Sequence, residues 1–231
     1  MKRFWTEATA APVGSSWQVL LDGRVVKTQA GSAQVVTTAA LAEAMAAEWH
    51  NQGETVDPDS LPLRDLADYA IDVIAPDRAA AAAQLRRYAE TDTLCYRAEA
   101  DEPLFTRQLA LWEPLLVAAE VRWDIHFERI SGVIHRAQSP ATLTRLERVL
   151  AAHDDFALAA LTTLSALSAS LVIALGALEP EADAAELWNS ANLEEDWQAE
   201  LWGSDAEAAT RRARRLASFN AAQRFARLAS A

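Results

Sequence analysis

The chain has 231 residues, with 21 basic and 33 acidic side chains and a net charge of −12. Apolar residues make up 51% of it, which is typical of a folded globular protein. The acidic balance argues against nucleic acid as a partner, because phosphate binding requires a basic surface. A single cysteine, Cys95, excludes an internal disulfide and suits a reducing compartment.

Residues 1–37 are predicted to form a small β domain. Two β-prone runs, residues 17–21 and 24–28, flank Asp22-Gly23, a strong signal for a two-residue hairpin turn. Residues 34–37 add a further candidate strand. Because an isolated hairpin is marginally stable in water, this sheet must pack on another element.

Residues 38–231 are predicted to form an all-α domain. Thr38 can cap a first helix, in which Leu41, Met45 and Trp49 recur every four residues and which Gly53 would close.

A second helix is expected to bury one face and to end or restart at Pro76. The residues of that face are Leu66, Tyr69, Ala70 and Val73.

Further helices are expected over residues 79–90 and 102–121, the second with a kink or break after Trp112 because Pro114 follows. The alternation of apolar residues over 124–134 indicates a short strand or an extended connection.

Ser139-Pro140 is typical of a helix start, with a capping serine and proline at the first helical position. Residues 156–178 then carry no charge and are long enough to span a bilayer. Hydroxyl residues interrupt them and acidic residues flank both ends, which favours a buried central helix over a membrane span. The predicted fold class is therefore α+β, mainly α: a small N-terminal antiparallel β unit packed on a large C-terminal helical bundle.

A short helix is predicted just ahead of Gly203, followed by a last helix that Ser204 would begin. Leu193, Trp197 and Leu201 fall four residues apart and form one apolar stripe on it. We expect Trp197 to lie in the core, so that its truncation to alanine costs about 3–5 kcal/mol.

Glu194, Glu195 and Asp196 crowd the first turn of that helix, where carboxylates complement the positive end of the helix dipole. The same pattern is typical of an ordinary solvated helix.

Motifs that carry catalysis are absent from the sequence. It has no phosphate-binding glycine loop, no nucleophile elbow and no HExxH helix, and its four histidines lack paired metal-ligand spacing. Glu194, Glu195 and Glu200 could supply a general acid and base, but no nucleophile, metal or oxyanion hole accompanies them. We therefore expect no catalytic residue, no cofactor and no metal; a small carboxylate-based enzyme stays the weaker alternative.

The last helix carries four clustered arginines, Arg211, Arg212, Arg214 and Arg215. They indicate either a solvated face that pairs with acidic surface or a patch for an acidic partner. A generic helical adaptor that binds through this helix is the second alternative.

Four stretches in a definite order carry a resemblance to a known family. They are residues 41–49 with 61–63 and 70–72; Tyr88 with residues 91–98; Leu104, Gln108, Trp112 and residues 114–116; and residues 193–195 with Gln198, Trp202 and Gly203. In this order and spacing, the chain resembles the ATP-twelve chaperone family, the assembly factors for the catalytic head of F-type ATP synthase in mitochondria and α-proteobacteria. Gln29 and Thr37 depart from the pattern, since prolines are expected there.

The resemblance implies a chaperone without enzymatic activity. Such a protein binds the unassembled α subunit of the ATP synthase head and prevents its aggregation until the β subunit replaces it. We also expect a monomer when free, with no nucleic acid partner and no membrane insertion. No presequence precedes Arg3, which favours a bacterial cytoplasmic member.

The resemblance also locates the surface that binds the client, meaning the protein that the chaperone holds. The family's sensitive acidic residue falls in the short acidic helix; we place it on Glu195, with Glu194 as the alternative. Glu200, Trp202 and Gly203 complete the candidate client-binding residues.

Overall fold

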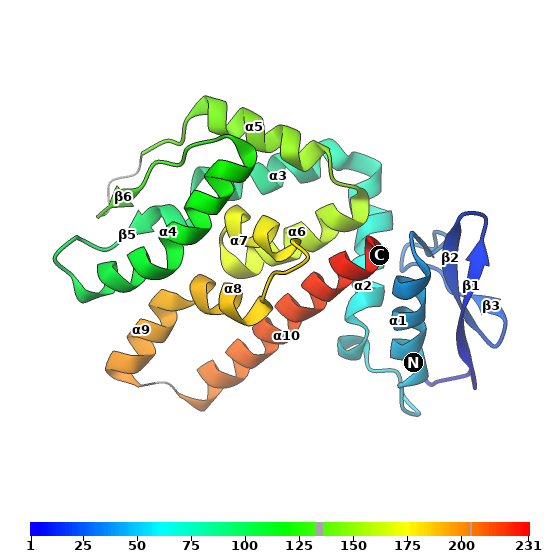
Figure 1. Ribbon diagram of the computed structural model, residues 1–231. Coiled ribbons are helices and arrows are strands. Elements are labelled where there is room, and N and C mark those ends of the chain that lie inside the picture. Colours follow the sequence, from blue (N-terminus) through cyan, green and yellow to red (C-terminus); the bar gives the residue numbers. More distant parts are fainter. Residues whose placement is uncertain (133–135, 204) are drawn as a thin grey trace. The chain divides into compact units, whose positions relative to one another are not determined.

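The computed structural model describes residues 1–132, 136–203 and 205–231. The chain divides into two compact units (Figure 1). The first comprises Met1–Arg78, Asp154–Ala160 and Ala221–Ala231, and the second Ala79–His153 and Leu161–Asn220. None of the boundaries between the two units falls after residue 37. The domain boundary expected after residue 37 stays a prediction.

The first unit holds an antiparallel sheet in which β2 pairs with the three other strands. Its strands are β1 (Ala8–Val13), β2 (Ser16–Leu21), β3 (Arg24–Val25) and β4 (Val35–Val36). The predicted hairpin is confirmed: Leu21 pairs with Arg24 around Asp22 and Gly23, whose φ angles of 46° and 77° suit the tight turn. Strand β1 was not predicted, because three of its six residues are alanines and one is a proline, both of which are uncommon in strands.

Helix α1 (Ala39–His50) packs against β1 and β2 and buries its predicted apolar face. The predicted cap is confirmed, since Thr38 Oγ1 accepts the Leu41 N–H at 3.1 Å. The helix ends at Asn51 and not at Gly53, so that part of the prediction is wrong. Asn51 keeps a right-handed conformation and its N–H bonds the Ala47 carbonyl, so no left-handed glycine is needed.

Helix α2 (Pro62–Tyr69) continues into a π-helical turn (Ala70–Ile74) and a 3-10 turn (Ala75–Asp77) that contains Pro76. Of the face expected from the sequence, Ala70 is buried and Leu66 and Tyr69 are half-buried, whereas Val73 is exposed and was wrongly included. The buried side also holds Leu63, Ala67 and Ile74. Buried Asp68 also lies there, and it accepts hydrogen bonds from Gln34 Nε2 and the Gln29 N–H. These two bonds tie the turn before β4 to α2.

The second unit is mainly helical. Its helices are α3 (Arg78–Glu90), α4 (Pro103–Trp123), α5 (Pro140–Ala151), α7 (Leu171–Ala177), α8 (Ala184–Ala191) and α9 (Leu193–Trp202). Helices α6 (Asp155–Ser168) and α10 (Ala206–Ala229) contribute residues to both units. The extended connection expected after α4 contains β6 (Ile130–Ser131), which pairs in parallel with β5 (Tyr96–Arg97). The predicted fold class, α+β and mainly α, is confirmed.

Helix α4 runs through Pro114 without the break that was one of two outcomes expected after Trp112; the other, a kink, stays a prediction. Pro114 is exposed, so its ring meets solvent and only one backbone hydrogen bond is lost. The predicted start of α5 is confirmed, since Ser139 Oγ accepts the Ala141 N–H at 3.2 Å.

The uncharged stretch 156–178 was expected to form one helix, but it forms most of α6 and the whole of α7. Ala169 takes a left-handed conformation (φ 51°), and Ser170 caps α7 by accepting the Ile173 N–H at 3.0 Å. Ser168, Ser170 and the following apolar residues are buried. Within the described residues, no helix combines the length and the apolar character that crossing a bilayer requires.

Candidate functional site

Helix α9 follows α8 almost without a linker. Asn192 joins the two helices and its Nδ2 donates to the Trp188 carbonyl at 2.8 Å. Leu193 is buried and anchors the first turn, while Gly203 ends the helix with a φ of 84°. The expected Ser204 cap of the next helix lies outside the described residues. At the start of α10, Asp205 Oδ1 accepts the Ala208 N–H at 2.7 Å.

The apolar stripe predicted for α9 is buried only at its beginning. Trp197 is half-buried and Leu201 is exposed, so the expectation that Trp197 lies in the core is wrong. The Arg107 guanidinium of α4 covers the Trp197 ring at 4.4 Å from its centroid. A cation–π contact at the surface therefore takes the place of core packing.

Truncation of Trp197 to alanine should therefore cost about 1–2 kcal/mol of unfolding free energy. Urea titration of Trp197→Ala, Arg107→Ala and the double variant measures this cost and the coupling between the two side chains. A loss of about 3 kcal/mol or more in the Trp197 variant would contradict the surface placement.

The three glutamates of the predicted site bond three different side chains. Glu194 Oε1 accepts from Gln108 Nε2 at 2.8 Å, and Glu200 pairs with Arg107 at 2.8 Å, both on α4. Burial of its carboxyl group raises the pKa of Glu194, whereas the hydrogen bond from Arg107 lowers the pKa of Glu200.

Glu195 lies on the other side of α9 and its Oε2 is 3.6 Å from Arg215 Nη1 of α10. Consecutive residues of a helix point about 100° apart, so Glu194 and Glu195 reach different neighbours. The three carboxylates do not converge as a general acid and base would need to.

A groove of about 390 Å³ lies between α9 and the start of α10. It is lined by Glu195, Trp202 and Gly203 among the predicted site residues, together with Asp196 and Arg212. Glu194 and Glu200 do not line it, so the structure splits the predicted set in two. Trp202 is 81% exposed, and so large a bare indole is typical of a binding surface.

Two of the four clustered arginines of α10 are used inside the unit. Arg212 Nη2 bonds Asp196 Oδ2 and Arg215 Nη2 bonds the Leu167 carbonyl, each at 2.8 Å. Both guanidinium groups also lie near the Trp188 ring. Arg211 and Arg214 remain exposed. Only these two of the four clustered arginines are therefore exposed for an acidic partner, as the adaptor alternative would require.

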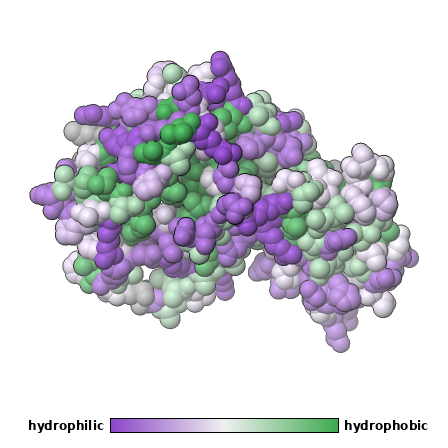
Figure 2. Space-filling model, in the orientation of Figure 1, coloured by the Kyte–Doolittle hydropathy of each residue, from purple (hydrophilic) through white to green (hydrophobic). Residues whose placement is uncertain are grey.

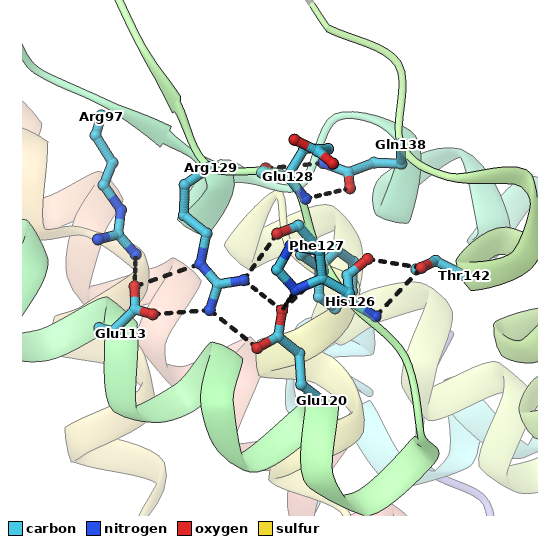
Figure 3. Close-up of polar contacts among 9 residues, drawn as sticks. All are labelled: Arg97, Glu113, Glu120, His126, Phe127, Glu128, Arg129, Gln138 and Thr142. Carbon is cyan, nitrogen blue, oxygen red and sulfur yellow. Dashed lines mark hydrogen bonds and ion pairs between the residues drawn. The ribbon is translucent and has the colours of Figure 1, made fainter.

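An ionic cluster on α4 was not predicted from the sequence (Figure 3). Arg129, in the segment before β6, lies between Glu113 and Glu120 of α4, and buried Arg97 also bonds Glu113 at 2.6 Å. Hydrogen bonds from the arginines hold the pKa of Glu113 below its usual range. Since each of these charges has a partner, the cluster fastens the segment before β6 to α4, and no local sequence pattern signals it.

The remaining chemistry-bearing side chains form no site in the part of the chain that the structure describes. Burial raises the pKa of the Cys95 thiol, which makes it a poor nucleophile. Among the described residues, no three histidine, cysteine or carboxylate side chains gather as a metal site would require. His135 lies outside those residues.

Comparison with known proteins decides the family. Residues 2–120 match the model of the family described as "ATP12 chaperone protein". This chain belongs to the ATP12 chaperone family. The resemblance drawn from the sequence is thereby confirmed.

Relatives of the family support the whole length of the fold. The mitochondrial protein atp12 of Schizosaccharomyces pombe is 25% identical over 215 residues, which cover 88% of this chain and 74% of that protein. The crystal structure of Atp12 from Paracoccus denitrificans is 36% identical with a TM-score of 0.93, covering 99% of this chain and 98% of that one. A protein of Agrobacterium tumefaciens described as a chaperone is 37% identical with a TM-score of 0.93, covering 98% of this chain and 85% of that one.

The family model and the solved structures cover different parts of the candidate site. The family match ends at residue 120, within α4, and so does not reach α9. The Paracoccus structure covers nearly the whole chain, α9 included. The fold around the groove is thus that of the ATP12 family, while the roles of the groove residues stay predictions.

Proposed function

We propose that this ATP12 family member binds the unassembled α subunit of the F-type ATP synthase head and prevents its aggregation until the β subunit replaces it. It would act as a monomer in the bacterial cytoplasm, without a catalytic step. Membership of a chaperone family supports the assembly role, and the Paracoccus and Agrobacterium relatives support a bacterial setting.

The observation that carries the proposal is the groove beside α9. It is lined by the half-exposed carboxylate of Glu195 and the exposed indole of Trp202. Gly203, which has a positive φ angle and follows Trp202, also lines it. An indole offers a large rigid contact area, and an acidic rim attracts and orients a basic partner surface.

The mechanism that we propose is competition for a surface. A subunit destined for a ring exposes apolar edges that aggregate when bare. The chaperone covers such an edge until the proper neighbour displaces it. Rim carboxylates suit this exchange, because they act more on the rate of encounter and on orientation than on the final affinity.

Charge reversal of Glu195 should abolish protection of the client and leave the fold intact. Glu195 is half-exposed and its pairing with Arg215 is a surface ion pair, which contributes about 0–1 kcal/mol. Light scattering of freshly diluted α subunit, alone and with wild type, measures protection, and thermal unfolding measures the fold. The matched control is Glu181→Lys, which reverses an exposed glutamate that lies outside the groove.

Three results are decisive. Suppression by wild type and Glu181→Lys but not by Glu195→Lys, reversed on adding β subunit, supports both the function and the groove. Suppression by all three proteins keeps the function and removes Glu195 from the site. Failure of wild type to suppress scattering contradicts the proposed function.

A further inference from the structure

Helix α4 is apolar on two opposite sides. One side is buried in the second unit through Gln108, Trp112, Leu116 and Ala119. The opposite side, here the outer face of α4, is exposed yet carries no charge from residue 110 to residue 121. The exposed residues of the outer face are Ala110, Pro114, Val117, Ala118 and Val121.

A helix that faces solvent normally carries polar residues on its outer side. Val121 is 80% exposed and Val117 is 45% exposed. The two charged residues in the stretch lie off this face and pair with arginines: Glu113 with Arg97 and Arg129, and Glu120 with Arg129. The space-filling view shows such hydrophobic surface among polar patches on the visible side of the second unit (Figure 2). An apolar outer face of this kind indicates a partner.

Pro114 adds a polar feature to the outer face. Proline has no N–H, so the Ala110 carbonyl lacks the helical hydrogen bond that residue 114 would otherwise donate. Both residues are exposed and lie on the outer face. A partner with a backbone or side-chain donor opposite this carbonyl would satisfy it, as a purely apolar partner would not.

The outer face begins next to two candidate client residues of α9 that lie outside the groove. Arg107, just before the outer face, bonds Glu200 of α9, and Gln108 beside it bonds Glu194. Helices α4 and α9 are thus in contact, with apolar residues on the outer face of α4 and these two carboxylates on the neighbouring side of α9.

Size and charge indicate what covers this surface. Twelve residues of helix span about 18 Å, and a strip about 10 Å wide offers roughly 180 Å², against about 800 Å² per partner in a stable interface. The outer face is thus too small for a dimer by itself. In a symmetric dimer of a chain with net charge −12, the acidic groups of α9 would also face like charge. A basic partner with an apolar patch fits both properties.

We infer that the outer face of α4 is the apolar half of the client-binding surface. It accepts an apolar segment of the unassembled ATP synthase α subunit that donates an N–H to the Ala110 carbonyl, while α9 supplies the acidic rim. This inference rests on the function proposed above.

The test compares two double variants in the full chain. Val117→Lys with Val121→Lys places two charges on the outer face; Val25→Lys with Val73→Lys places the same charges at valines that are 47% and 52% exposed in the first unit. We expect the outer-face variant to bind the α subunit at least tenfold more weakly and to lose protection in light scattering. The control variant should bind as wild type does, and both should melt near the wild-type temperature.

A third variant, Pro114→Ala, tests the free carbonyl. Alanine restores the N–H, so the Ala110 carbonyl is satisfied within the helix. We expect a melting temperature equal to or above that of wild type and client binding several-fold weaker. Binding that is unchanged in this variant removes the hydrogen bond from the inference.

Each outcome separates this inference from the proposed function. If wild type protects the α subunit and the outer-face variant does so equally, the inference is wrong and the function stands. If wild type does not protect, the function fails and the inference with it. If wild type sediments as a dimer and the outer-face variant as a monomer, the outer face is a contact between copies of this chain, which also overturns the inference.

Discussion

Trp112→Ala is expected to lower the free energy of unfolding by about 3–5 kcal/mol. The indole is fully buried, and its Nε1 donates to the Ser190 carbonyl at 2.8 Å, which joins α4 to α8. Truncation leaves a cavity and a buried carbonyl without a donor, and the two costs add. Urea unfolding at neutral pH, followed by circular dichroism, gives the difference.

A second variant separates the two costs. Trp112→Phe keeps most of the ring volume but removes the donor to Ser190, so we expect a loss of about 1–3 kcal/mol. Equal losses for Phe and Ala would assign the whole effect to the hydrogen bond. A loss below 1 kcal/mol for Trp112→Ala would contradict the central place of this side chain in the core.

Asp92→Asn is expected to cost about 2–4 kcal/mol at pH 7. Asp92 is fully buried and its two oxygens accept the N–H groups of Leu94 and Val172, each at 3.1 Å, with further bonds from Ser170 and Leu171. An amide has one acceptor oxygen, and its NH₂ group would meet a backbone N–H. The substitution therefore leaves buried donors unpaired where α7 begins.

The same carboxyl group should shape the pH dependence of stability. Burial raises the pKa of Asp92 to about 6, against these hydrogen bonds, which lower it. The pKa of Asp92 is higher in the folded state than in the unfolded state, so its protonation stabilises the fold. This contribution to the free energy of unfolding is full below the unfolded pKa, near 3.9, and is lost as pH rises through about 6.

Urea titrations from pH 4 to pH 7 test this dependence. Wild type should lose on the order of 2–3 kcal/mol from this group over that range, and Asp92→Asn should lose that slope. Asp101→Asn, which changes an exposed aspartate of the same unit, serves as the control. An unchanged slope in the Asp92 variant would show that titration of Asp92 does not cause the pH dependence.

Local patterns in the sequence were sufficient wherever a structure depends on neighbouring residues. The Asp22-Gly23 hairpin and the caps at Thr38 and Ser139 formed as predicted, since each needs only a few adjacent residues. The break at Ala169 was missed because the apolar pattern of residues 156–178 continues on both sides of it. There a buried serine cap outweighs helical periodicity.

Which tryptophan lies in the core could not be read from spacing. Trp112 and Trp197 both fall on regular apolar positions of a helix, yet the first is fully buried and the second lies half-buried under Arg107. The difference comes from what each helix packs against. Sequence periodicity describes one helix at a time and does not contain that information.

The candidate site shows the same division. The sequence alone placed Glu194, Glu195 and Trp202 on one short helix, and the family resemblance gave that helix its expected role. Only the tertiary structure separated the two glutamates, by setting α4 against one side of α9 and α10 against the other.

The sequence by itself determined the fold class, the hairpin and most helix positions, because turns, caps and apolar periods are properties of adjacent residues. It also indicated the family, through the order and spacing of four stretches along the chain. The tertiary structure alone decided the pairing of β5 with β6, the ion pairs around Arg129 and the exposure of the outer face of α4. These features join residues far apart in the chain or depend on which side of a helix finds a neighbour. Their energies arise only when distant segments meet.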